Sequence, residues 1–168
     1  MMCDRTTLKI ISHRGNIKGP QPDKENRPSY IDCAIGNGYQ VEIDVNLRDG
    51  ELWLGHDEPQ YKINHKWIDE RADYLWLHCK DFDAARECWQ YQAFCHSGDP
   101  FVYTSNGKIW LHGENDNLYT LDDMTIIPVI NEEDSKSFGT MLLRGSTQFF
   151  GMPFGVCTDY PAIIGEYV

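Results

Sequence analysis

Long apolar segments are missing from this sequence, and so is any excess of positive charge. No apolar run approaches the roughly 20 residues that a membrane-spanning helix needs. The first residues, 1–5, lack the apolar core of a secretory signal peptide. We therefore expect a cytoplasmic protein without a membrane span.

Basic residues are few, with 15 lysines and arginines against 26 aspartates and glutamates, which gives a net charge of -11. A surface with this charge repels the phosphates of nucleic acids, so a nucleic-acid partner is not expected. A phosphate-bearing small molecule would need a local group of cations, or a bound metal ion, to overcome the same repulsion.

Paired cysteine motifs, internal repeats and linker-like segments are also missing. With 168 residues, of which 41% are hydrophobic and 12% aromatic, the chain is expected to form one packed domain over residues 1–168. The cysteines show no spacing that favours a structural zinc site, and most lie in apolar contexts typical of buried thiols. They are Cys3, Cys33, Cys79, Cys88, Cys95 and Cys157.

Three polar clusters stand at the ends of strand-like apolar runs in the first third of the sequence. They are His13-Arg14-Gly15, Glu42-Ile43-Asp44 and His56-Asp57. Parallel α/β folds form their active sites where the carboxyl ends of strands meet. This pattern predicts that the three clusters lie together at one rim of a sheet or barrel.

Glu42 and Asp44 are two residues apart on an expected strand, so their side chains point to the same face. Two carboxylates on one face repel each other unless a cation or a shared proton lies between them, and a hard divalent cation suits them. The alternative is that one carboxylate points into solvent at the end of the strand. Histidines in the two other clusters favour a site, because a histidine pair beside a metal-bound substrate is an acid/base arrangement.

Alternation of apolar residues and turn signals predicts a mixed α/β domain. Strands are expected at 8–12, 40–45, 51–55, 74–80, 93–95, 101–103, 109–111, 124–130 and 155–158. Helices are expected at 28–36, near 65–71, at 82–91 and after 160, with a hairpin turn at Asp49-Gly50. Residues 131–150 are polar and carry no clear pattern.

The polar motifs resemble, in order and spacing, those of the glycerophosphodiester phosphodiesterase family. The matching pieces are His13-Arg14-Gly15, Glu25-Asn26, Glu42-x-Asp44 with Val45, Asp49-Gly50, His56-Asp57, Lys80 and Thr158-Asp159-Tyr160-Pro161. The resemblance implies a (β/α)8 barrel of the TIM type. Full members are considerably longer, so this chain would be a trimmed barrel that lacks several outer helices.

The resemblance also implies a role for each motif residue. His13 and His56 would be the catalytic acid/base pair, and Arg14, Lys80 and Asn26 would bind the substrate. The metal ligands would be Glu42, Asp44 and Glu25, together with His78, which stands where the family has an acidic ligand two residues before the lysine. The cofactor would be a divalent cation, Mg, Ca or Mn, and His78 leaves its identity open.

Three functions are consistent with these residues. The first is metal-dependent hydrolysis of a small phosphodiester, glycerophosphodiester-like or related, by a His/His acid-base pair. The second is a catalytically weak or inactive relative that binds a phosphorylated ligand, and the third is an ordinary α/β domain that works through protein contacts. Asp159 is interpreted as a structural residue at the start of the terminal helix.

Overall fold

One curled sheet organises the chain, with helices on its outer side. A computed structural model describes residues 8–112, 122–144 and 151–168. Over these residues the sheet contains ten strands. In chain order they are β1 (Lys9–His13), β2 (Gln40–Arg48), β3 (Glu51–Leu54), β4 (Tyr61–Ile63), β5 (Leu75–Cys79), β6 (Ala93–Phe94), β7 (Phe101–Tyr103), β8 (Ile109–Leu111), β9 (Thr125–Pro128) and β10 (Gly155–Thr158).

Neighbouring strands run parallel through most of the sheet, in the order β6-β5-β2-β1-β10-β9-β8. Strand β7 is antiparallel to β8, while β3 and β4 extend from β2 as antiparallel strands. The predicted Asp49-Gly50 turn joins β2 to β3, with φ values of 52° and 74° that suit a type I′ hairpin. Because the parallel strands share one direction, their carboxyl ends all lie at the same rim.

The inner face of the curl is filled by apolar side chains from six strands. Phe94 of β6 stacks on Trp110 of β8 with 4.2 Å between ring centroids, although no ladder joins β6 to β7 or β8 among the described residues. The predicted mixed α/β class is confirmed, and the sheet is a curled half-barrel. The inner cluster contains Ile11, Trp76, Phe94, Trp110, Ile126 and Cys157.

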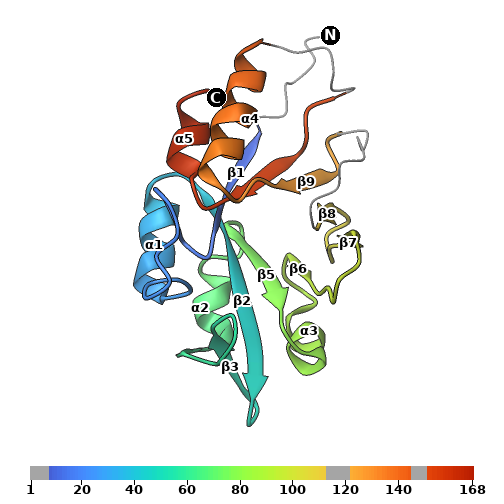
Figure 1. The fold of residues 1–168 in the computed structure, drawn as a ribbon. Helices are drawn as coiled ribbons and strands as arrows, with labels where there is room; N and C mark the ends of the chain where they lie inside the picture. Colours follow the sequence, from blue (N-terminus) through green and yellow to red (C-terminus); the bar gives the residue numbers. More distant parts are fainter. Residues whose placement is uncertain (1–7, 113–121, 145–150) are drawn as a thin grey trace.

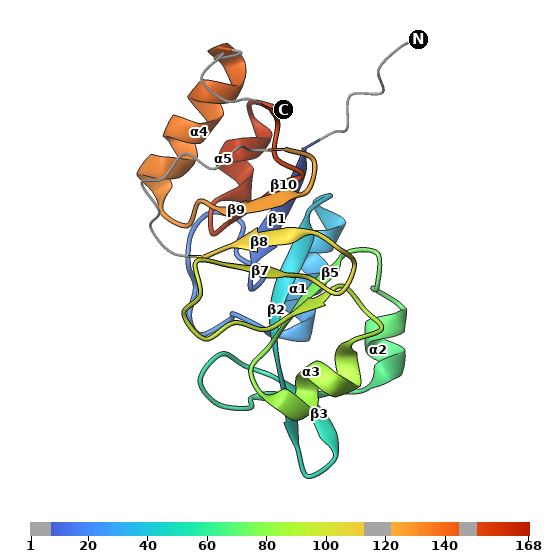
Figure 2. The ribbon, with the colours of Figure 1, turned by 90° about the vertical axis from the view of Figure 1, so that its right-hand side faces the viewer.

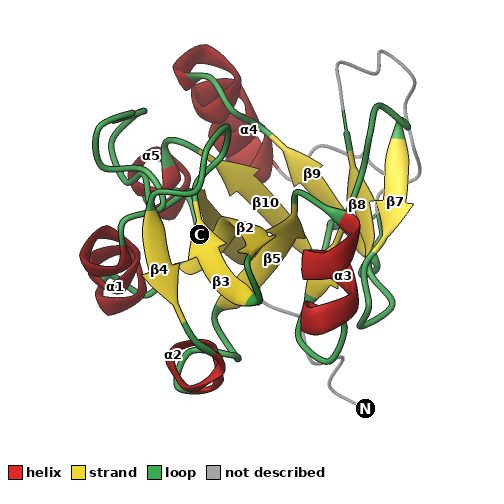
Figure 3. Cartoon of the chain, turned by 90° about the horizontal axis from the view of Figure 1, so that it is seen from below, coloured by secondary structure: helices red, strands yellow, loops and turns green. Residues whose placement is uncertain are grey.

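Five helices in the described residues pack on the outer side of the sheet, as Figure 3 shows. None of them is both long and apolar enough to cross a bilayer. Helices α4 and α5 lie together at one end of the molecule, opposite β3 and α3 (Figures 1 and 2). The helices are α1 (Pro28–Gly36), α2 (His65–Asp69), α3 (Phe82–Cys88), α4 (Glu132–Arg144) and α5 (Pro161–Gly165).

Two outer clusters hold these helices against the sheet. The larger one joins α1, α2 and α3 to β2 and β5, and includes Ile31, Ile68 and Ala84. The smaller one joins α4 and α5 to β1 and β10, through residues such as Phe138 and Ile164. All five residues of β5 are buried, as its nearly continuous apolar sequence predicts for a strand covered on both faces.

Most predicted elements are confirmed, with boundaries that differ by a few residues. Helix α4 was not predicted, because its first two turns carry Glu, Asp, Ser and Lys, and its apolar spacing begins only at Phe138. Strand β4 was not predicted either, since three residues are too few to show an alternating pattern. Both elements form through tertiary contacts: β4 pairs with β3, and α4 packs on the sheet through Phe138.

Helix α3 offers a test of local stability. The Asp81 side chain accepts hydrogen bonds from the backbone N–H of Ala84 (2.8 Å), which caps the helix, and of Leu47 (3.0 Å) in β2. We expect Asp81→Ala to lower the free energy of unfolding by about 1–2 kcal/mol, measured by urea denaturation. Asp81→Asn keeps an acceptor oxygen, so its loss should be smaller. If both variants lose the same free energy of unfolding, the effect comes from the ion pair between Asp81 and Arg48, which both substitutions remove, and not from the helix cap.

Candidate functional site

A pocket of about 570 Å³ lies at the carboxyl ends of the parallel strands. Side chains reach it from β1, β2, β5, β6, β8, β9 and β10, from the segments that follow β1, β3, β5, β6, β8 and β9, and from Asp134 of α4. Three separate motifs of the sequence therefore meet there. Six of the residues predicted to form the site line this pocket: His13, Arg14, Glu42, His56, His78 and Lys80.

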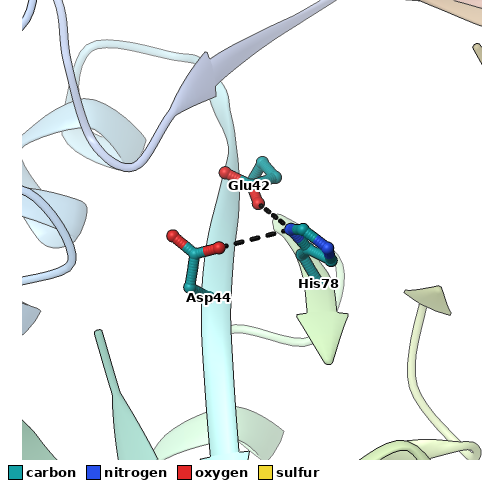
Figure 4. Close-up of side chains that lie close together, drawn as sticks. All are labelled: Glu42, Asp44 and His78. Carbon is teal, nitrogen blue, oxygen red and sulfur yellow. Dashed lines mark ion pairs between the residues drawn. The ribbon is translucent and has the colours of Figure 1, made fainter. Parts of the chain in front are cut away.

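Glu42, Asp44 and His78 form a buried group beside the pocket, in which one possible ligand atom of each lies within 4.8 Å of the others. Strands β2 and β5 are neighbours, and their register sets Asp44 opposite His78. The Nδ1 atom of His78 lies 3.2 Å from Asp44 Oδ1 and 3.5 Å from Glu42 Oε1 (Figure 4). The same-face prediction for the two carboxylates is confirmed by this convergence.

Two carboxylate oxygens of the group are buried without a hydrogen bond. They are Glu42 Oε2 and Asp44 Oδ1, and Glu42 and Asp44 are only 2% and 0% exposed. Asp44 Oδ1 lies within ion-pair distance of His78 and Lys80, and Glu42 Oε2 lies 3.9 Å from His13 Nε2, so nearby cations compensate the buried charge only in part. Two carboxylates and one imidazole are a donor set that fits a divalent cation, and a cation would bind the two oxygens that make no hydrogen bond.

Asp44 is surrounded by cationic and polar groups from three segments. Arg14 Nε lies 2.9 Å from its Oδ2, Lys80 Nζ lies 3.6 Å from its Oδ1, and Asn26 Nδ2 donates a 2.9 Å hydrogen bond to Oδ2. Burial by itself raises the pKa of Asp44, but the interaction with His78 and the charge of Arg14 hold this pKa well below its ordinary value. Asp44 is therefore ionised across the physiological pH range.

His13 is held by Asp159, a residue that the sequence pattern did not assign to the site. Its Nδ1–H donates a 2.8 Å hydrogen bond to Asp159 Oδ1, so Nε2 is the nitrogen on the side of Glu42, 3.9 Å from Oε2. The terminal helix does begin just beyond, at Pro161, but Asp159 is more than a helix-start residue. A pattern in the sequence could have indicated this contact. His13 and Asp159 each lie two residues after a member of the inner cluster, Ile11 and Cys157 respectively, and these two face each other in neighbouring strands.

We expect the pKa of His13 to lie above its ordinary value of 6.5. Burial lowers this pKa, but the hydrogen bond to Asp159 and the charges of Glu42 and Asp159 raise it by more. Asp159→Asn should therefore lower the pKa of His13, which NMR titration of the imidazole in metal-free protein can measure. An unchanged pKa in this variant would contradict the assigned cause.

The same shift has a consequence for stability. A histidine with a raised pKa in the folded state stabilises the protein fully below its unfolded-state pKa, and this contribution is lost as the pH rises through the folded-state pKa. The free energy of unfolding of metal-free protein should thus fall as the pH rises above about 6.5. In Asp159→Asn the fall should be smaller, as urea denaturation at pH 6 and pH 8 would detect.

His56 lies at the outer part of the pocket, in the loop after β3. Its Nδ1 atom hydrogen-bonds to Asp57 Oδ1 at 2.7 Å, so the neighbouring aspartate orients the imidazole. Gly55, with φ of +149°, sets the path of this loop, because a Cβ there would overlap the carbonyl oxygen of Glu58. The His56 side chain is 40% exposed, in contrast to the largely buried His13.

Glu25 and Asn26 do not line the pocket but support the residues that do. The Glu25 carboxylate pairs with Arg14 Nη1 at 3.2 Å and accepts a 2.9 Å hydrogen bond from Asn16. Glu25 therefore lies outside the group formed by Glu42 and the other two candidate ligands. The Asn26 side chain donates a hydrogen bond to the Asp44 carboxylate and accepts one from the Asp44 backbone N–H. Both Asn26 and Arg14 have a left-handed backbone conformation, with φ of 61° and 55°. Such strain persists only where surrounding contacts hold it, often at functional sites.

Two further histidines, His96 and His112, line the pocket and were not predicted. Each follows an aromatic residue of the inner cluster by two positions, Phe94 and Trp110 respectively, just as His78 follows Trp76. A search for histidines two residues beyond apolar strand positions would have found them. Burial lowers the pKa of His96 to about 4, so this ring is neutral at pH 7.

Comparisons with known proteins add no assignment. No protein-family model matches the chain, and no curated protein matches it. The geometry of the pocket is therefore the basis for a functional conclusion.

Proposed function

We propose that this chain is a metal-dependent phosphodiesterase that hydrolyses a small phosphodiester, with a glycerophosphodiester-like compound as the first candidate. We also propose that its curled sheet is a trimmed (β/α)8 barrel of the glycerophosphodiester phosphodiesterase type. One observation carries the proposal: the buried Glu42, Asp44 and His78 group lies beside a pocket that is lined by two histidines, each bonded to an aspartate.

The proposed metal ligands are Glu42, Asp44 and His78. When bound there, a divalent cation neutralises the non-bridging phosphate oxygens and polarises the phosphorus. Arg14 and Lys80 supply further positive charge in a chain whose net charge is -11. The planar guanidinium of Arg14 suits a phosphate oxygen, while the Lys80 ammonium acts as a point charge.

His13 and His56 are the proposed acid/base pair. In both, Nδ1 is bonded to a carboxylate, of Asp159 and Asp57 respectively, which leaves Nε2 to exchange a proton with the substrate. One imidazole accepts the proton of the attacking hydroxyl or water, and the other gives a proton to the departing alkoxide. If the substrate carries a hydroxyl next to the phosphate, that hydroxyl is the nucleophile and a cyclic phosphate is released first.

The direct test is hydrolysis of glycerophosphodiesters and generic aryl phosphodiesters in the presence of Mg²⁺, Ca²⁺ or Mn²⁺. We expect metal-dependent turnover that a chelator abolishes. Absence of turnover with every metal, in protein shown to be folded by circular dichroism, would end the proposal. Single-turnover analysis of the products then decides whether a cyclic phosphate forms.

A second candidate function is binding of a phosphorylated ligand without turnover. It is favoured by the two cationic groups already around Asp44, since Arg14 and Lys80 partly neutralise the carboxylates, and His78 adds a third positive charge when it is protonated. This candidate predicts that phosphate esters raise the Tm without being consumed; a ligand at 100 times its Kd adds about 2.7 kcal/mol of stability. Absence of a shift would exclude it.

A further inference from the structure

The pocket has two chemically different sides. One part of its lining carries Glu42 and His78 with Arg14 and Lys80, here called the carboxylate side, and another part is built mainly from rings and apolar groups, with Asn131 and Asp134 as further polar lining residues. We call this second side the aromatic wall; it consists of Phe94, His96, Trp110 and His112. Leu111, Pro128 and Ile130 adjoin it.

The rings of the aromatic wall form a continuous stack that begins at a candidate metal ligand. The ring of His78 lies 5.0 Å from that of Phe94 and 4.5 Å from that of His96, with interplanar angles of 5° and 17°. Phe94 continues to Trp110 at 4.2 Å and 18°. His96 continues to His112 at 3.8 Å and 36°. A group attached to a phosphate near His78 would therefore lie beside aromatic rings.

The wall is held firmly in this geometry. Phe94 and Trp110 are 3% and 5% exposed and belong to the inner cluster, where Trp110 also packs on Trp76 at 5.9 Å. His96 and His112 are only partly buried, so their rings form the accessible part of the wall. A flat ligand ring entering beside them needs no rearrangement of the core.

We propose that the phosphodiester substrate carries a flat aromatic or heteroaromatic ring on one of its two alcohols, and that this ring stacks on the aromatic wall. The inference rests on the proposed function, because the phosphate must lie at the carboxylate side for the ring to reach the wall. A saturated alcohol such as glycerol gains no stacking with His96 and His112. Pairs of aromatic rings gain energy from offset-stacked or edge-to-face contacts, which a saturated group cannot make.

The test compares two phosphodiesters of similar size that differ chiefly in whether their ring is flat, and their rates are corrected for the uncatalysed hydrolysis of each ester. Benzyl methyl phosphate carries a flat ring, and cyclohexylmethyl methyl phosphate carries a puckered ring of similar size. With the divalent cation that supports turnover, we expect kcat/KM for the benzyl compound to be roughly 10-fold higher. Equal values, with clear hydrolysis of both, would overturn the inference and leave the proposed function intact.

Binding is measured separately, so that the inference does not depend on turnover. Isothermal titration calorimetry with methyl benzylphosphonate and methyl cyclohexylmethylphosphonate uses probes whose P–C bond is not hydrolysed. We expect the benzyl probe to bind with a Kd roughly 10-fold lower than that of the cyclohexylmethyl probe. This expectation holds whether or not the protein hydrolyses the corresponding esters. If neither probe binds and no phosphodiester is hydrolysed, the inference and the proposed function both fail.

Variants of the accessible rings assign the preference to the wall. His112→Leu and His96→Leu remove a flat ring while keeping most of its volume, so the benzyl preference should fall toward 1. His112→Phe keeps a flat ring without the nitrogens, so the preference should be retained. A preference unchanged in both leucine variants would contradict stacking on this wall, even if the wild-type protein discriminates between the two esters.

Discussion

Replacing Glu42 by glutamine should abolish tight binding of the divalent cation and lower kcat/KM for a phosphodiester on the order of 10³-fold. The physical reason is the loss of one of two charged ligands that converge beside His78. A metal ion that stabilises the charge of a phosphoryl transition state contributes several kcal/mol, and about 4 kcal/mol corresponds to a factor of roughly 10³. Calorimetric titration with Mn²⁺ and a hydrolysis assay would measure the two effects.

Glu25→Gln is the matched control for this variant. Glu25 is also a predicted ligand, but its two oxygens are taken by Arg14 and Asn16. We therefore expect Mn²⁺ affinity in Glu25→Gln to stay within a few-fold of the wild-type value. A loss as large as that of Glu42→Gln would return Glu25 to the ligand set, and retained affinity in Glu42→Gln would remove the metal centre from the proposal.

Replacing His13 by glutamine should lower kcat by 10²–10⁴-fold, the usual contribution of general acid–base catalysis. The variant keeps an amide near Asp159, so the fold should be retained while proton transfer is lost. His56→Gln should cause a loss in the same range, and the double variant should cost less than the product of the two losses if the residues act together. Steady-state kinetics under saturating metal would measure all three.

His65→Gln is the control for both histidine variants. His65 begins α2, pairs with Glu87 at 2.9 Å and Tyr91 at 3.1 Å, and does not line the pocket. Its replacement should leave kcat within about two-fold, in line with a surface substitution. If His56→Gln behaves like this control, the exposed imidazole is not part of the chemistry, and His13 would act with a different partner.

Local patterns in the sequence were enough to predict the candidate carboxylates and the strands that carry them. Glu42 and Asp44 are two residues apart on a strand, so their shared face follows from the period of the backbone alone. The end of β1 similarly gave His13, because an apolar run that stops at a polar residue marks the rim of a sheet, whereas Lys80, just after β5, was predicted from the family resemblance. Helix α1 followed from Pro28 at its first turn and the glycines after it.

Other parts of the site depend on contacts between distant segments, which no local pattern contains. Asp159 bonds His13 across 146 positions, and the pairing exists because β10 lies beside β1 in the sheet. Whether Glu25 faces a metal or an arginine depends on how the loop after β1 folds back on Arg14.

The sequence by itself determined the mixed α/β class, the same-face carboxylates and the polar residues at the ends of strands, because these follow from backbone periodicity and turn chemistry. Only the tertiary structure decided that the sheet is a curled half-barrel and that His96 and His112 join the pocket as an aromatic wall. The reason is that curvature and strand order fix which side chains meet, and both arise from packing over the whole sheet.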